Sequence, residues 1–517
     1  MEVAAAQVVD CENSANSMIK KFEKLKQKYA EISNINSAIS LLQWDRRTYM
    51  PPMGSEARAE ALSALESIAH EKFTSSEIGD LINELHDWAN DLNYDSFEAS
   101  FLRAAKRKYD REVKIPSDFV RESAREISLA TDLWTKAKQD SDFSLFAPQL
   151  EKIVNLTRQK ASYLIYTETP YDALLDLYEP GIKKSDLEPL FSELKEQLIS
   201  LTEKIKADEN KISNDILKND FGEESQVFFL DRLVCDLGYD PLKGRQDRSV
   251  HPFTISMSPA DVRITTRINK NYLSTGLYAS LHECGHALYD QGIRSEFERT
   301  PLAEGASYAI HESQSRFWEN IVGRSLPFSK WILPRLKEIF PSQFENTTPE
   351  DFYKAVNKAG PSLIRVEADE VTYNLHIILR FEIEVLLIES KISVTDIPDV
   401  WNEKMRDYFG IVPQKDSEGV LQDVHWTGSF GYFPSYALGN LISAQIFSKM
   451  EKETGDIEKA IEKGRFDVLL NWLRKKIHNY GAKYEPAELL SKSLGVKLSA
   501  EPFLEYLKKK YSDLYSF

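Results

Sequence analysis

A five-residue motif, HECGH at 282–286, brings two imidazoles and a carboxylate close together in the sequence. It lies within 274–292, a segment whose pattern predicts a helix. Four residues along a helix put His282 and His286 on one face, one turn apart, so that both side chains can reach one metal ion. Glu283 is rotated by about 100° from His282. We therefore expect Glu283 to act on water beside the metal, as a general base, rather than to bind the metal.

A third ligand is expected on a neighbouring helix, because a catalytic zinc takes three protein ligands and leaves one position for water. Thr300-Pro301 is a typical helix start, and it predicts a helix over the residues that follow. The acidic candidates on that helix are Glu304, Glu312 and Glu319. Small residues just before Glu312 permit close helix approach, which favours Glu312 modestly over Glu304 and leaves the choice open.

The elements that must position this site are mostly helical. Period-two patterns at 254–257 and 262–265, around a turn at 258–261, predict a small β-hairpin, whose edge would suit pairing with an extended peptide. We therefore expect a mainly α fold with a small β-sheet beside the metal site. Proline and glycine turn signals separate the predicted helices, which cover roughly 17–45, 54–72, 77–112, 117–138, 144–165, 184–209 and 223–237.

Composition excludes several classes of protein. The net charge is −16 and the chain has no long run of Lys or Arg, which argues against a nucleic-acid partner. Three widely spaced cysteines argue against a disulfide framework and fit a reducing compartment. No apolar stretch is long enough to predict a membrane span, and the N-terminus resembles neither a secretory signal nor a transit peptide. We expect a soluble, cytoplasmic protein.

Six motifs, in order along nearly the whole chain, resemble the thermostable carboxypeptidase (carboxypeptidase Taq) family of zinc metallocarboxypeptidases. The resemblance implies a large, helical, cleft-forming peptidase that works as a homodimer. It also implies removal of C-terminal residues, with broad specificity, from peptides that have a free carboxylate. The motifs are HPF at 251–253, DVRIT at 261–265, HECGH at 282–286, HESQ at 311–314, IRVEAD at 364–369 and GVLQDVHW at 419–426.

The resemblance also implies a ligand set, and the helical pattern together with the position of the motifs suggests a division of the chain. One Zn²⁺ per chain would be held by His282, His286 and Glu312, which selects Glu312 over Glu304; Co²⁺ or Mn²⁺ would also suit these donors. Residues 1–16 are interpreted as an N-terminal extension and 17–517 as one carboxypeptidase domain. Within it, 17–110 is a possible helical lid and 250–440 the catalytic core.

A carboxypeptidase needs a cation for the substrate's C-terminal carboxylate, and arginine offers a planar bidentate fork. The apolar segment 362–390 predicts one long helix, and Arg365 is the preferred carboxylate ligand on it. The alternative is an ordinary Arg365–Asp369 ion pair on a solvated face. Five polar residues of this segment follow one another at spacings of four, three, four and four, which predicts a single polar stripe along the helix. They are Arg365, Asp369, Thr372, His376 and Arg380.

Donors for the oxyanion of the tetrahedral transition state are also required. The candidates are His425 and a tyrosine in 428–436, among which Tyr436 is preferred. The remaining motif residues are predicted either to contact substrate, as Asp369, Arg263 and Gln422, or to support the site through hydrogen bonds, as His251, Asp261 and His311.

Two alternatives to a carboxypeptidase share this sequence pattern. An endo-acting oligopeptidase would have the same metal site but no use for a buried Arg365. A non-catalytic scaffold would keep the fold, but the loss of Glu283 or of a ligand is the usual sign of an inactive enzyme, and here all four residues are present.

Overall fold

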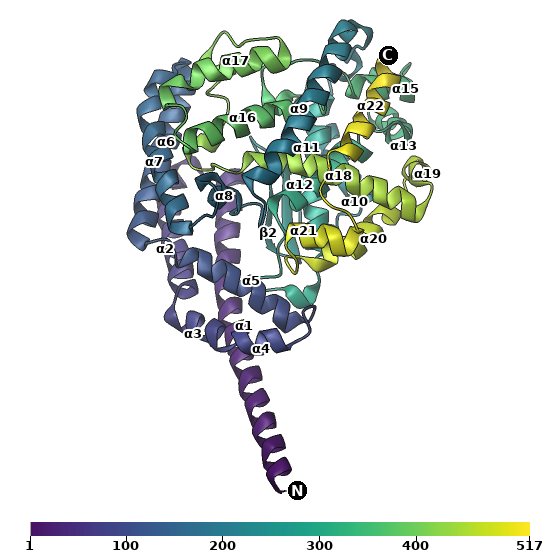
Figure 1. Cartoon of the computed structure of the whole chain (residues 1–517). Coiled ribbons are helices and arrows are strands. Elements are labelled where there is room, and N and C mark those ends of the chain that lie inside the picture. Colours follow the sequence, from purple (N-terminus) through teal and green to yellow (C-terminus); the bar gives the residue numbers. More distant parts are fainter. Residues whose placement is uncertain (1) are drawn as a thin grey trace.

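The computed structural model describes the backbone of residues 2–517, and the side chains of 16–208 and 210–517. Helices make up most of the chain, as predicted (Figure 1). The N-terminal part of α1 extends away from the remaining helices as a single rod. The first ten helices are α1 (Glu2–Thr48), α2 (Ser55–Phe73), α3 (Ser76–Glu84), α4 (His86–Asp91), α5 (Phe97–Glu112), α6 (Ser117–Asp140), α7 (Ala147–Leu164), α8 (Pro170–Leu175), α9 (Lys184–Ala207) and α10 (Glu223–Asp236).

Helices also dominate the part of the chain that follows the sheet. Helix α11 packs against the sheet and against α12, and α12 also packs against α18. These helices are α11 (Leu273–Gly292), α12 (Tyr308–Arg316), α13 (Leu326–Ile339), α14 (Pro341–Phe344), α15 (Pro349–Val356), α16 (Tyr373–Ile388), α17 (Ile397–Phe409), α18 (Phe433–Thr454), α19 (Ile457–Glu462), α20 (Phe466–Lys476), α21 (Pro486–Leu489) and α22 (Glu501–Tyr515).

The single helix predicted over 77–112 is instead three helices, α3, α4 and α5. The longer of the two breaks falls at 92–96, where Asn93 and Ser96 form hydrogen bonds with nearby backbone groups. The Asn93 side chain accepts from the Asp95 N–H, and Ser96 Oγ accepts from the Ala99 N–H at 3.2 Å and so caps α5. Such short polar side chains compete with helical hydrogen bonds.

The sheet has three strands, β1 (Gln246–Arg248), β2 (Thr254–Ser258) and β3 (Asp261–Thr266), in the order β1-β3-β2. The predicted hairpin is confirmed as the antiparallel β2–β3 pair. The parallel strand β1 was not predicted, because three polar residues give no period-two signal. Strand β2 lies at an edge, where the Ser37 hydroxyl of α1 donates to the Met257 carbonyl at 2.6 Å.

The helix predicted to begin at Thr300-Pro301 is wrong over its first turns, because α12 begins only at Tyr308. The Thr300 hydroxyl donates to the Phe297 carbonyl at 2.6 Å and accepts from the Leu302 N–H at 3.2 Å, so Thr300 stabilises a local turn instead. The true cap is Ser307, whose Oγ accepts from the Ile310 N–H.

The long helix predicted over 362–390 is wrong in its first third, because α16 begins at Tyr373 and residues 365–367 form only a short 3₁₀ turn. The hydrogen bonds of Asp369 explain why the helix begins only at Tyr373. Its carboxylate accepts the backbone N–H groups of Gly360, Val371 and Thr372, which closes the loop that precedes the helix. The predicted polar stripe therefore does not exist, and Asp369 serves this loop rather than pairing with Arg365.

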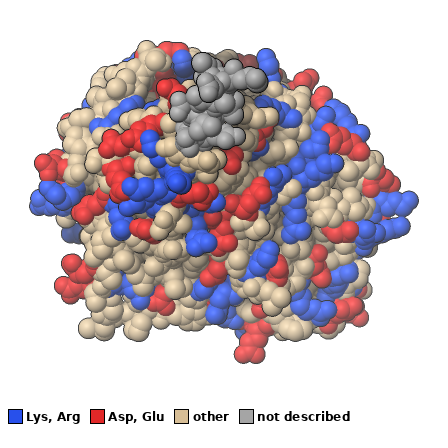
Figure 2. Space-filling view, turned by 90° about the horizontal axis from the view of Figure 1, so that it is seen from below, with Lys and Arg blue, Asp and Glu red and all other residues tan. Residues whose placement is uncertain are grey.

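No helix in the described part of the chain is long and apolar enough to cross a membrane. On the face that Figure 2 shows, acidic and basic side chains alternate over the coloured surface without forming one large basic patch. This mixture agrees with the absence of a basic stripe from the sequence.

Candidate metal centre

Two neighbouring helices bring the three predicted ligands together. His282 and His286 lie on α11 and Glu312 on α12, and one ligand atom of each lies within 4.8 Å of the other two. The Glu312 Oε2 atom is 3.8 Å from His282 Nε2 and 3.5 Å from His286 Nε2. Two imidazoles and one carboxylate are the donors of many catalytic zinc sites, so these residues fit a metal ion.

Two glycines allow the helices to approach closely enough for this geometry. A Cβ atom at Gly285 of α11 would lie 2.5 Å from the Gln314 carbonyl oxygen of α12. A Cβ atom at Gly439 of α18 would lie 2.5 Å from Glu312 Cγ. Helix α12 is therefore held between α11 and α18 with no room for a larger residue at either contact.

Glu319 orients the first histidine. Its Oε2 atom lies 2.8 Å from His282 Nδ1, which directs the lone pair of Nε2 toward the ligand group. Arg316 donates to Glu312 Oε1 at 2.6 Å and to Glu319 Oε2 at 3.2 Å. Burial opposes ionisation of Glu319, but Arg316 and His282 outweigh it and lower the Glu319 pKa to about 2. Both carboxylates are therefore charged at neutral pH.

Replacing Glu319 by alanine should weaken metal binding by about 10- to 100-fold, because outer partners of a ligating histidine typically contribute that much. Glu304→Ala is the matched control, since Glu304 is exposed. Metal affinity, measured by competition with a chelating dye, checks the expectation. Equal affinities in the two variants would show that Glu319 does not support the site.

Glu283 is buried next to the ligand group but is not part of it. The hydroxyl of Thr254, on the edge strand β2, lies 2.7 Å from Glu283 Oε2 and fixes the carboxylate. Burial raises the pKa of Glu283 above its ordinary value. A carboxylate that is buried, oriented and more basic than usual is suited to accept a proton.

His311, which was predicted to support the site through hydrogen bonds, contacts the second histidine. Its ring stacks on His286 with centroids 4.5 Å apart and planes at 18°. Its Nε2 atom lies 2.9 Å from Asp290 Oδ1. His311 and Asp290 also line the large cavity described below, so they connect the ligand group to that cavity.

Arg365 lies in a buried cluster with Arg380 and Asp423. Its Nε and one terminal nitrogen donate to Asp423 Oδ1 at 2.9 and 2.7 Å, and its other terminal nitrogen donates to the Tyr373 hydroxyl at 3.1 Å. Arg380 Nε donates to Asp423 Oδ2 at 2.5 Å. Two guanidinium groups and one carboxylate leave this cluster with a net positive charge.

The predicted oxyanion donors adjoin this cluster. His425 Nε2 lies 3.1 Å from the Tyr436 hydroxyl, and His425 Nδ1 lies 3.8 Å from Asp423 Oδ1. Burial lowers the pKa of His425 to about 4, so its imidazole is neutral at pH 7. The Arg365 guanidinium lies 5.3 Å from the centroid of the Tyr436 ring. The structure thus brings together three residues that the sequence had selected from separate motifs.

The remaining predicted residues are Arg263, Asp261 and Gln422, which make side-chain contacts within the protein, and His251, which does not lie in the interior. Arg263 is paired with Asp261 at 2.8 and 2.9 Å, so Asp261 orients Arg263 and not a ligating imidazole. Gln422 Oε1 accepts from the Arg365 backbone N–H at 3.1 Å and from Arg380 at 3.0 Å. His251 is exposed. These contacts place Gln422 as a support for Arg365.

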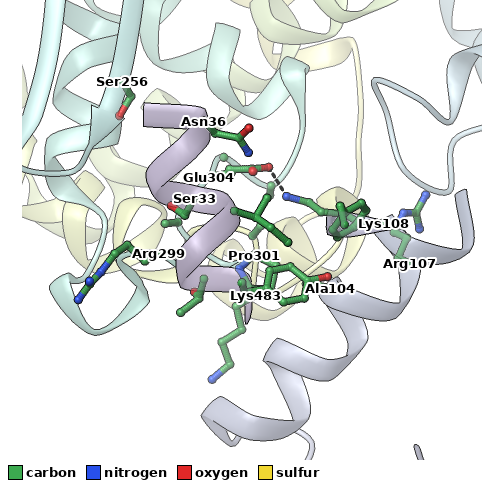
Figure 3. Close-up of a pocket in the computed structure, with 18 of the residues that line it drawn as sticks. Ser33, Asn36, Ala104, Arg107, Lys108, Ser256, Arg299, Pro301, Glu304 and Lys483 are labelled. Atoms are coloured by element: carbon green, nitrogen blue, oxygen red, sulfur yellow. Dashed lines mark hydrogen bonds and ion pairs between the residues drawn. The ribbon is translucent and has the colours of Figure 1, made fainter. Parts of the chain in front are cut away.

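A cavity of about 1200 Å³ lies between α1, α5 and the loop that precedes α12. Figure 3 shows Ser33 and Asn36 of α1 and Ser256 of β2 around it, and the ion pair that joins Lys108 to Glu304 at 2.6 Å. The ligands are not in its lining, but His311 is. Glu304, the alternative third ligand, therefore belongs to the cavity wall and not to the ligand group.

Sequence reasoning missed the roles of Thr254, Arg316, Asp423 and Glu319. Glu319 had been considered only as a ligand, and the other three had no assigned role. Arg316 and Glu319 follow Glu312 by four and seven residues, a helical spacing that could have suggested a shared face. Nothing local signals the pairing of Thr254 with Glu283, because it joins a strand to a helix.

Comparisons with known proteins identify the family of this chain. The sequence model of the family described as Carboxypeptidase Taq (M32) metallopeptidase matches residues 24–511. Carboxypeptidase 1 of Bacillus subtilis is 41% identical over 94% of this chain and 96% of its own length. Thermostable carboxypeptidase 1 of Thermus thermophilus is 41% identical over 96% of this chain and 99% of its own. The crystal structure of the M32 carboxypeptidase from Deinococcus radiodurans R1, 35% identical, superposes with a TM-score of 0.93 over 96% of this chain and 100% of that one.

Proposed function

Because the chain belongs to the carboxypeptidase Taq (M32) family of metallopeptidases, we propose that it is a zinc enzyme that removes C-terminal residues from peptides with broad specificity. The observation that carries the proposal is the convergence of His282, His286 and Glu312 beside the buried carboxylate of Glu283. The proposal includes a homodimer, which the resemblance implies, a cytoplasmic location, which the composition favours, and a lid formed by 17–110, which the helical pattern of the N-terminal part suggests.

The three ligands would hold one Zn²⁺, which, when bound, supplies Lewis-acid polarisation of the scissile carbonyl and lowers the pKa of water. Glu283 accepts the proton of the attacking water and then donates it to the leaving amine. The hydrogen bond from Thr254 keeps the Glu283 carboxylate aimed during both transfers. The large cavity would hold the part of the peptide that precedes the scissile bond, alongside the edge strand β2.

Tyr436 and His425 are the proposed donors that stabilise the oxyanion. A neutral imidazole has one N–H, and the hydrogen bond between His425 and Tyr436 orients the phenol. Both groups are largely removed from water, where hydrogen bonds to a developing charge are stronger than in solution.

Arg365 keeps part of its donor capacity for substrate. A guanidinium has five N–H donors, and Asp423 and Tyr373 engage three of those of Arg365. One donor remains on each terminal nitrogen, which is the geometry of a bidentate carboxylate contact. Together with the net positive charge of the cluster, this supports recognition of a free C-terminal carboxylate.

Arg365→Ala is expected to weaken kcat/KM for free-acid peptides by about 2–5 kcal/mol, roughly 30- to 5000-fold, as for a desolvated charge pair that loses one member. C-terminally amidated peptides should be poor substrates of the wild-type enzyme and nearly unaffected by the substitution. Arg365→Lys should recover only part of the loss, because an ammonium lacks the bidentate fork.

The measurement is kcat/KM for one peptide in both C-terminal forms with the three proteins. If Arg365→Ala lowers kcat/KM equally for the free-acid and the amidated peptide, Arg365 has a structural role as a partner of Asp423. Efficient cleavage of the amide by the wild type would favour the endo-acting alternative.

A further inference from the structure

Helix α12 carries Glu312. The first turn of this helix is hydrogen-bonded to a segment that lies far away in the sequence. The backbone N–H groups of a first helical turn have no partner within the helix. Here the N–H of Tyr308 donates to the Tyr178 carbonyl at 3.2 Å, and the N–H of Ala309 donates to Glu179 Oε1 at 2.6 Å. The cap residue Ser307 accepts the next N–H, so the turn is fully paired.

Glu179 also contacts the helix that carries Tyr436. The hydroxyl of Ser435 donates to the same atom, Glu179 Oε1, at 2.7 Å. One oxygen atom therefore bridges the residue three positions before Glu312 and the residue directly before Tyr436. Glu179 lies in the connection between α8 and α9, and its neighbours Leu177, Tyr178 and Pro180 line the large cavity.

Burying the Glu179 carboxyl group destabilises the folded protein. This cost suggests that the residue has a specific function. Glu179 is 0% exposed, and burial raises the pKa of its carboxyl group to about 7, although hydrogen bonds from Ser435, Ser307 and the Ala309 N–H favour the charged form. Burying such a group costs free energy that burying an apolar side chain would not. A carboxylate at the start of α12 also interacts favourably with the helix dipole, but many side chains could cap a helix from its own sequence.

We propose that Glu179 is a positioning residue for hydrolysis, which sets the place of Glu312 relative to Tyr436 by fixing the first turns of α12 and α18 to one oxygen atom. Helices α12 and α18 are in close contact where Gly439 meets Glu312, so a shift of one helix displaces the other. A misplacement of about 1 Å between reacting groups costs on the order of 100-fold in rate. The part of this inference that concerns Tyr436 rests on the function proposed above.

Glu179→Ala, Glu179→Gln and Ser435→Ala test the proposal. Glu126→Gln is the matched control, because Glu126 is 3% exposed and its side chain is paired with Gln149 and Lys152 of α7. The experiment measures kcat and KM on a free-acid peptide at saturating Zn²⁺, the dissociation constant of Zn²⁺, and the midpoint of thermal unfolding.

In Glu179→Ala we expect kcat to fall by about 30- to 100-fold, Zn²⁺ binding to weaken at least tenfold, and KM to stay within threefold. Glu179→Gln retains an acceptor at Oε1 and should recover kcat to within about fivefold of wild type. Ser435→Ala should lower kcat about three- to tenfold and leave Zn²⁺ affinity unchanged, because it breaks only the contact to α18.

The proposal is overturned if Glu179→Ala loses thermal stability yet keeps kcat and Zn²⁺ affinity within threefold of Glu126→Gln. If Glu179→Ala does not fold, Glu179→Gln and Ser435→Ala still decide, because independent effects in their double variant would show that the shared oxygen does not couple the helices. If the wild type cleaves no peptide, the proposed function fails, while the Zn²⁺ affinities still report on Glu179.

Discussion

Replacing Glu283 by glutamine is expected to lower kcat by about 10²–10⁴-fold, the usual contribution of a general base. The amide has nearly the same shape and can still accept the hydrogen bond of Thr254, but it cannot take a proton. Because Glu283 is not in the ligand group, Zn²⁺ content and KM should both stay close to those of the wild type.

Steady-state kinetics on a free-acid peptide, together with metal analysis of the same preparation, measures this effect. Glu126→Gln is the control, because Glu126 is also a buried glutamate and its side chain is paired with Gln149 and Lys152 of α7. Activity of Glu283→Gln within threefold of that control would exclude Glu283 from proton transfer.

Replacing Glu312 by glutamine should abolish tight metal binding and, with it, peptide hydrolysis. The variant keeps His282 and His286 but loses the negative charge that the site offers to a divalent cation. Burial opposes ionisation of Glu312, yet Arg316 and the two histidines hold the pKa of Glu312 well below its usual range, so the full charge is present at neutral pH. The substitution also leaves Arg316 with a weaker partner.

The fold should survive this change, since Glu312 packs as a side chain of similar size in either form. Far-ultraviolet circular dichroism of Glu312→Gln, compared with the wild type and Glu304→Gln, checks that the loss is local. Unfolding of Glu312→Gln would show instead that this carboxylate is needed for stability.

The elements of the fold that depend on local hydrophobic periodicity were predicted well. The helical class, the hairpin at 254–265 and the helix that carries HECGH each depend on residues within a few positions of one another. The family was also predicted correctly from its six motifs.

The errors lie where a side chain competes with the helix for backbone hydrogen bonds. Thr300-Pro301 has the residue types of a helix start, but the hydroxyl of Thr300 is used in a local turn. The residues before Tyr373 are apolar enough for a helix, yet Asp369 captures three backbone N–H groups and delays it. Periodicity alone does not distinguish these outcomes.

Long-range pairings could not be predicted from one sequence. Asp423 is 58 residues from Arg365, and Glu179 is 130 residues from Ala309, so neither contact has a local signal. The pairing of Arg365 with Asp423 rather than Asp369 is the clearest case, because the helical spacing predicted the wrong carboxylate. The ligand roles of His282, His286 and Glu312 stay predictions that this geometry supports.

The central claim is that His282, His286 and Glu312 hold the catalytic metal ion. Its most direct test is a titration of metal-free wild type, Glu312→Gln and Glu304→Gln with Zn²⁺, with bound metal and peptide hydrolysis followed together. The account predicts one tight equivalent of Zn²⁺ per chain in the wild type and in Glu304→Gln, with hydrolysis by the wild type rising in proportion to bound metal. In Glu312→Gln it predicts no tight Zn²⁺ binding and no peptide hydrolysis. One tight equivalent and normal activity in Glu312→Gln would contradict the account and move the third ligand elsewhere.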